Sequence, residues 1–129
     1  MPIVAHGIDL VLCARIERVC RDHGDHFLDR VFTQREQAYC TTPGARVARL
    51  SGRFAAKEAV LKALGTGWRG GIQWTDIEIL PDELGKPHVT LTGRTAELAA
   101  ELGIGEFLIS ISHAGDYAMA SVIGVARTG

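Results

Sequence analysis

The sequence has no apolar run of about 18 residues, so no segment is expected to span a membrane. Residues 1–13 contain neither lysine nor arginine, which argues against an amino-terminal secretion signal. The 3 cysteines are an odd number and fit no disulfide framework. These absences predict a reduced, cytoplasmic protein with no membrane partner.

An excess of charge of one sign is also missing. The 14 Lys and Arg residues against 15 Asp and Glu residues leave a net charge of −1, and aromatic residues make up only 6% of the chain. Neither a basic surface field nor exposed aromatics therefore support nucleic-acid binding. The charge is uneven, however, because residues 30–62 contain seven basic side chains and two acidic ones. Such a segment favours a confined anion site, with an ordinary solvated helix face as the alternative.

Common nucleotide-binding signatures are absent or misplaced. No G-K-[ST] sequence occurs, which excludes the Walker phosphate loop. Residues 65–70 match G-x-G-x-x-G, but they follow an expected helix, whereas the dinucleotide fingerprint follows a strand. We therefore interpret this segment as a flexible loop.

The remaining composition is that of an ordinary globular protein. A chain of 129 residues with 47% apolar and 22% charged residues suits a single domain over 1–129. Apolar periodicity and turn residues predict strands over 3–12, 74–80, 88–91, 107–112 and 117–125, and helices over 13–20, 33–40, 45–64 and 94–102. These elements do not alternate regularly, which favours an α+β fold with an antiparallel sheet.

Local signals set several of the expected helix ends. Thr33 and Glu36 have the spacing of a capping box, and Thr92 is a candidate cap for the helix over 94–102. Gly65 follows the last apolar residue of the strongest helix, as a carboxyl-terminal cap commonly does. Residues 113–116 predict the turn of a hairpin between the last two strands.

Asp9 is an unexpected residue in the first strand. The period of two places Asp9 on the same face as Gly7 and Val11, among apolar side chains. A carboxylate there needs a cationic partner or a metal ion to offset its desolvation. The alternative is that the strand ends early and leaves Asp9 in water.

Glu58 is the second carboxylate of interest. On a helical wheel it lies four residues after Phe54, at the edge of the apolar stripe, with Lys62 one turn further along the same row. Asp9 and Glu58 together would suit Mg²⁺, which binds one or two carboxylates plus substrate phosphates. A surface Glu58–Lys62 pair is the alternative. The same helix offers three basic residues to those phosphates: Arg49, Arg53 and Lys57.

Several segments, in this order, resemble the 4′-phosphopantetheinyl transferase family of the holo-acyl-carrier-protein synthase type. The most specific are GIDL at 7–10, GRFAAKEA at 52–59 and KALGTG at 62–67. Weaker matches are FTQRE at 32–36, DIEI at 76–79, GKP at 85–87 and SISH at 110–113. The resemblance covers nearly the whole chain and implies that family's fold, an antiparallel sheet packed against a long helix.

The resemblance implies an activity. Such enzymes move the 4′-phosphopantetheine arm of coenzyme A to a serine of an apo acyl carrier protein and release 3′,5′-ADP. Asp9 and Glu58 match the family's Mg²⁺ ligands, and Lys62 matches a lysine beside the reacting phosphate. The resemblance also implies a homotrimer, because longer relatives contain two copies of this unit with the substrate cleft between them.

Further residues match the family's binding groups. Arg53 and His113 match residues that hold the 3′-phosphate end of coenzyme A. Arg15 matches an arginine that docks on an acidic carrier helix, although further basic residues of that helix are replaced here by His23 and His26. A non-catalytic coenzyme A or nucleotide-binding module of the same fold is the alternative function. The loop beside the adenosine is matched by Gly85, Lys86 and Pro87.

Overall fold

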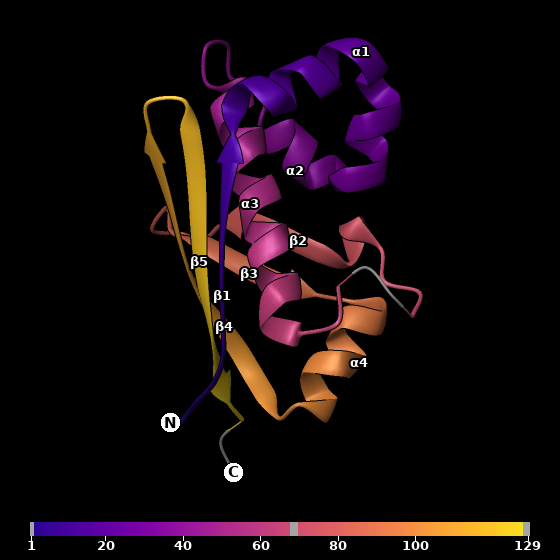
Figure 1. Ribbon diagram of the computed structural model, residues 1–129, viewed down its shortest axis with the longest axis vertical. Helices are drawn as coiled ribbons and strands as arrows, with labels where there is room; N and C mark the ends of the chain where they lie inside the picture. Colours follow the sequence, from indigo (N-terminus) through magenta and orange to yellow (C-terminus); the bar gives the residue numbers. More distant parts are fainter. Residues whose placement is uncertain (1, 68–69, 128–129) are drawn as a thin grey trace.

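A three-stranded antiparallel sheet forms one side of the molecule (Figure 1). The structure, a computed structural model, describes residues 2–67 and 70–127. Strand β5 (Tyr117–Ala126) lies in the middle of the sheet, between β1 (Ile3–Leu12) and β4 (Ile104–Ala114). The first strand has the expected bounds; β4 begins three residues earlier and ends two later than expected, and β5 ends one residue later.

The long helix α3 (Arg46–Leu64) packs across the inner face of this sheet (Figure 1). Two glycines allow the close approach. A Cβ at Gly7 would lie 1.9 Å from the carbonyl oxygen of Ala59, and a Cβ at Gly52 would lie 2.9 Å from Cγ2 of Ile111. The helix ends at Gly65, whose φ of 77° confirms the expected left-handed cap. An antiparallel sheet against a long helix confirms the expected α+β fold.

A second, smaller sheet is a hairpin on the other side of α3. It consists of β2 (Ile77–Pro81) and β3 (Pro87–Leu91), with β2 against α3 and β3 approaching β4. The expected strand over 74–80 begins later, because the 3₁₀ helix η1 (Trp74–Asp76) comes first. Helix α4 (Gly93–Glu101) follows the hairpin; Thr92 occupies its cap position, but its side chain makes no capping hydrogen bond.

Helices α1 (Cys13–Val31) and α2 (Gln34–Tyr39) cover one end of α3 (Figure 1). Helix α1 is much longer than the expected 13–20. It is interrupted at Gly24, where φ is 50° and ψ is −129°, and the chain then resumes a helical path. The second half buries Leu28 and Val31 in the core. The capping box of Thr33 and Glu36 is present as expected.

The core lies between α3 and the two sheets. α3 is buried on most sides, because Ala55, Ala56 and Val60 are inaccessible to solvent in addition to the expected apolar stripe. Among residues 2–67 and 70–127, we find no helix that is long and apolar enough to cross a bilayer.

Candidate active site

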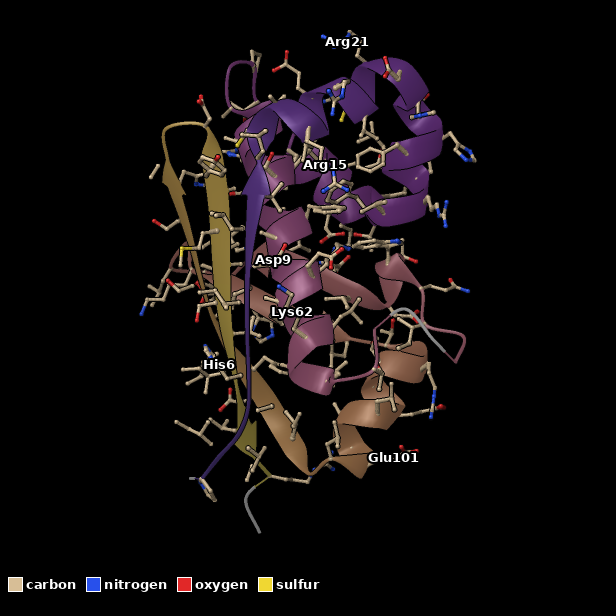
Figure 2. The ribbon with its side chains drawn as sticks, in the orientation of Figure 1. His6, Asp9, Arg15, Arg21, Lys62 and Glu101 are labelled. Atoms are coloured by element: carbon tan, nitrogen blue, oxygen red, sulfur yellow. The ribbon has the colours of Figure 1, made fainter. Side chains whose placement is uncertain are left out.

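Asp9 and Lys62 face each other across the gap between β1 and α3 (Figure 2). Lys62 Nζ lies 2.9 Å from Oδ1 of Asp9 and donates a second hydrogen bond to the carbonyl oxygen of Ile8 at 3.1 Å. The Asp9 side chain is 18% exposed, whereas that of Lys62 is 56% exposed. The carboxylate therefore points inward, as the period of two predicted, and it has the cationic partner that its burial requires.

Glu58 lies on α3 one turn before Lys62 and is partly buried. It lines a pocket of about 310 Å³ together with Leu61, Lys62, Gly65 and Gly67. One carboxylate thus comes from β1 and one from α3, and Lys62 pairs with the first and lines a pocket with the second. The site is thus built where the first strand passes the carboxyl-terminal half of the long helix.

This donor set fits Mg²⁺ by its chemistry. Both carboxylates supply hard oxygen ligands, and Asp9 already holds a cationic group at short range. Within the described part of the chain, no group of three or more His, Cys, Asp and Glu side chains converges in a way that could hold a metal ion. A cation bound by Asp9 and Glu58 would therefore complete its coordination with water and with oxygen atoms of the substrate.

A second pocket of about 600 Å³ continues from the first, since both are lined by Gly65 and Gly67. Its other described lining residues include Thr66, Arg94 and Leu98. The left-handed cap at Gly65 turns the chain away from α3, which leaves space beside the helix end. The expected loop over 65–70 falls partly outside the described residues, because it includes Trp68 and Arg69.

The structure does not place Lys57 where the sequence analysis expected it. Its side chain is 0% exposed, and its ammonium donates to Glu36 Oε1 at 2.7 Å and to the carbonyl oxygens of Trp74 and Ile77. Burial lowers the pKa of Lys57, and the Glu36 carboxylate opposes this shift. All three hydrogens of the ammonium have partners inside the protein. Lys57 is therefore not available to bind a phosphate.

Arg53 is also largely buried, at 6% exposure. Its Nε donates to the carbonyl oxygen of Ile79 at 3.2 Å, and its Nη1 donates to that of Arg49 at 3.3 Å. The guanidinium lies over the ring of Tyr39, 4.4 Å from the centroid. Arg49 packs against the same ring and donates to the carbonyl oxygen of Tyr39 and the hydroxyl of Thr42.

His113 lies near the other end of α3 from Lys62. Its side chain is exposed, its Nε2 is 2.8 Å from the carbonyl oxygen of Ala48, and it packs against Gly52. Arg53 lies on the amino-terminal half of α3 and His113 on β4 beside it, whereas Glu58 and Lys62 lie on the carboxyl-terminal half. The expected site residues form two separate groups within one chain.

Two further expected groups are exposed. Gly85, with φ of 83°, and Lys86 form the β2–β3 turn, which Asp82 closes by accepting the backbone N–H of Lys86 at 2.9 Å. Arg15 lies on the first turn of α1, directly after β1, and therefore close along the chain to Asp9 (Figure 2).

The sequence analysis missed one buried residue, Glu36. It appeared only as a capping residue, yet its side chain is inaccessible to solvent and also accepts hydrogen bonds from Lys57 and from the backbone N–H of Ile79.

The fold agrees with comparisons to known proteins. Residues 5–122 match the 4′-phosphopantetheinyl transferase superfamily, and the chain belongs to this superfamily. The curated relatives reported for this chain are named holo-[acyl-carrier-protein] synthase. A holo-[acyl-carrier-protein] synthase of Geotalea daltonii is 45% identical over 121 residues, which cover 94% of this chain and 97% of the relative.

Solved structures show the same similarity. The crystal structure of a holo-[acyl-carrier-protein] synthase from Neisseria meningitidis has a TM-score of 0.87 and 35% identity, covering 96% of this chain and 99% of that one. The synthase from Helicobacter pylori, solved in complex with coenzyme A, has a TM-score of 0.81 and 32% identity, covering 93% and 99%. The family resemblance inferred from the sequence is thereby confirmed.

Proposed function

We propose that this chain transfers the 4′-phosphopantetheine arm of coenzyme A to a serine of an apo acyl carrier protein and releases 3′,5′-ADP. Membership of the transferase superfamily and relatives named holo-[acyl-carrier-protein] synthase support this function. The observation that carries it is that Lys62 pairs with Asp9 across the gap between β1 and α3 and lines one pocket with Glu58.

In the proposed reaction, the serine oxygen forms a bond to the phosphorus nearer the pantetheine arm. The bond from that phosphorus to the bridging oxygen breaks, the serine proton is released, and the bridging oxygen leaves on 3′,5′-ADP. Negative charge grows on the phosphate oxygens, and a positioned ammonium stabilises such charge. Lys62 is exposed enough to reach a phosphate from its place beside Asp9.

The metal belongs to this proposal. Mg²⁺, when bound by Asp9 and Glu58, would neutralise part of the pyrophosphate charge. The two residues orient the substrate by fixing where its phosphates lie relative to α3. We place Arg53 and His113 at the 3′-phosphate, and Gly85, Lys86 and Pro87 beside the adenosine.

We further propose that three copies assemble and complete the site between them. The two groups of site residues lie along different halves of α3, and a neighbouring copy would bring the second group to each site. The outer face of the sheet supports an interface, because helices α1–α4 all lie on its other side (Figure 1). Large apolar side chains are exposed on that face: Ile8, Leu10, Leu12, Leu108, Tyr117 and Met119.

The carrier partner is expected at α1. Arg15 is exposed immediately after the strand that carries Asp9, so a carrier held there would have its serine near the metal site. We place the protein in the cytoplasm, which its three free cysteines support, and we propose that residues 1–129 form one domain.

Release of 3′,5′-ADP separates this function from the alternative, a non-catalytic module that only binds coenzyme A. With excess coenzyme A and apo carrier, the transferase should release 3′,5′-ADP in many-fold excess over enzyme. A binding module would retain coenzyme A unchanged, and that result would contradict the proposal.

A further inference from the structure

Strand β2 has a free edge that no other strand covers among the described residues. In an antiparallel pair, alternate residues direct their backbone groups away from the partner strand. In β2 these residues are Ile77 and Ile79, since their groups bond to side chains rather than to β3. Such an edge needs other donors and acceptors when it is buried.

Three buried side chains supply them. Lys57 donates to the carbonyl oxygen of Ile77, Glu36 accepts the N–H of Ile79 at 2.8 Å, and Arg53 donates to the carbonyl oxygen of Ile79 at 3.2 Å. The carbonyl oxygen of Ile77 and then the N–H and carbonyl oxygen of Ile79 are thus bonded one after another along the edge, as they would be by a neighbouring strand.

The spacing of α3 explains why a helix can do this. Arg53 and Lys57 are four residues apart, a rise of about 6 Å along the helix. The carbonyl oxygens of Ile77 and Ile79 are two residues apart on a strand, a repeat of about 7 Å. The spacing of Arg53 and Lys57 on α3 therefore matches the spacing of the carbonyl oxygens on the edge of β2. The helix and the strand run in opposite directions.

The same contacts join three separate segments of the chain. Glu36 Oε1 accepts both Lys57 Nζ at 2.7 Å and the N–H of Thr33 at 2.9 Å, so the pair also fixes the start of α2. Lys57 Nζ lies 5.5 Å from the centroid of the Phe32 ring. Both side chains of the pair are inaccessible to solvent, so a change in either partner leaves the other as a buried charge without its counter-charge.

We infer that Glu36 and Lys57 are positioning residues for coenzyme A, acting through the β2–β3 hairpin. This inference rests on the proposed function, in which the turn of that hairpin, with Gly85 and Lys86, lies beside the adenosine. The pair fixes β2 on α3, the helix that carries Glu58 and Lys62. The buried ion pair thereby sets the distance between the adenosine loop and the residues proposed to bind the phosphates, although it contacts neither the adenosine nor the phosphates.

The first test is Lys57→Met, which keeps the volume of the side chain and removes its charge. We expect the KM for coenzyme A to rise about tenfold while kcat changes less than about threefold, because the hairpin is proposed to contact the adenosine and so contributes uniform binding away from the reacting phosphorus. The KM for the carrier should stay unchanged. A drop in kcat with an unchanged KM for coenzyme A would overturn the inference.

Amide hydrogen exchange, followed by NMR, reports on the hairpin without reference to activity. In the unmodified protein the Ile79 amide should exchange as slowly as the paired amides of β2, and in Lys57→Met it should exchange at least about tenfold faster. Fast exchange of Ile79 in the unmodified protein would overturn the inference. The inference would also be overturned if Lys57→Met lost the protection of the Ile79 amide but kept the KM for coenzyme A of the unmodified protein.

Arg35→Met is the matched control, because Arg35 joins α2 to β2 through an exposed pair with Glu78 at 3.3 Å. It should change neither KM nor the Ile79 exchange rate. If Lys57→Met does not fold, the double variant Glu36→Leu/Lys57→Met replaces the ion pair by apolar contacts and should show the same raised KM and faster exchange. Absence of transfer by the unmodified protein would refute the proposed function, whereas the exchange data would still decide whether the pair holds the hairpin.

Discussion

Lys62 Nζ lies 2.9 Å from Oδ1 of Asp9, which joins the long helix to the first strand through an ion pair at the proposed site. A surface pair with Glu58 was the alternative for Lys62 in the sequence; the structure shows Lys62 bonded to Asp9 and to the backbone of Ile8. Because the Lys62 side chain is 56% exposed, this pair contributes little to stability, roughly 0–1 kcal/mol. Its role is to hold a cation and a carboxylate together where phosphates are proposed to bind.

Removing either carboxylate should abolish most of the transfer. We expect Asp9→Ala and Glu58→Ala to lower turnover at least about a hundredfold without unfolding the protein, since each leaves the pyrophosphate charge uncompensated. EDTA should have the same effect on the unmodified protein, and added Mg²⁺ should restore activity. Turnover is measured by 3′,5′-ADP release and folding by circular dichroism. Near-normal turnover in both variants would contradict the metal assignment.

Lys62→Ala should affect the chemical step. An ammonium that stabilises charge developing in the transition state contributes about 3–4 kcal/mol, which corresponds to a loss of roughly a hundredfold or more in kcat. The KM for coenzyme A should change much less. Steady-state kinetics with saturating carrier separates the two quantities. Normal kcat with weaker coenzyme A binding would show that Lys62 holds only the ground state.

The assembly proposal predicts that activity depends on the outer sheet face. Leu10 is 61% exposed and lies opposite Met119 in the register of β1 and β5. Leu10→Asp places a charge on this face, and we expect light scattering to show a monomer with little activity in place of a trimer. The matched control, Leu84→Asp, alters an exposed leucine in the β2–β3 turn and should leave the trimer intact. An unmodified protein that is active as a monomer at assay concentration would contradict the proposal.

Arg15→Glu should act on the carrier alone. Carrier proteins are acidic, and charges at the rim of an interface mainly steer association. The KM for the carrier should therefore rise, and that for coenzyme A should stay nearly constant. Added salt should raise the carrier KM of the unmodified protein in the same direction. Arg21→Glu changes a charge further along α1. Comparing its KM for the carrier with that of Arg15→Glu tests whether the effect is confined to the start of the helix. An unchanged carrier KM in Arg15→Glu would exclude this helix start from docking.

Local rules predicted most of the fold. The period of two placed Asp9 on the inner face of β1, and the capping box and Gly65 set the ends of α2 and α3. The same rules ended the first helix at residue 20, whereas α1 continues to Val31 across an interruption at Gly24 and buries apolar residues in its second half. A glycine followed by polar residues indicates a helix end, and only the packing of Leu28 and Val31 shows that the helix resumes.

The site was predicted only in part, for a physical reason. A helical wheel describes one helix, so it did not show that Lys57 is held in a buried ion pair or that Arg53 also bonds to a strand. Their actual partners, Ile77 and Ile79, lie 20 and 26 residues away on a strand edge that the wheel does not include. Basic residues on the buried face of a helix bond to the backbone of the segment that packs against them. Which segment packs there is set by the tertiary fold and does not follow from residue spacing along the sequence.

The proposed transfer is tested most directly by the intact mass of an apo acyl carrier protein after incubation with the unmodified protein, coenzyme A and Mg²⁺. A carrier in which the acceptor serine is replaced by alanine provides the control. We predict that the carrier gains the mass of one phosphopantetheine arm, that an equal amount of 3′,5′-ADP appears, and that the alanine carrier stays unmodified. An unchanged carrier mass under these conditions would contradict the proposed function.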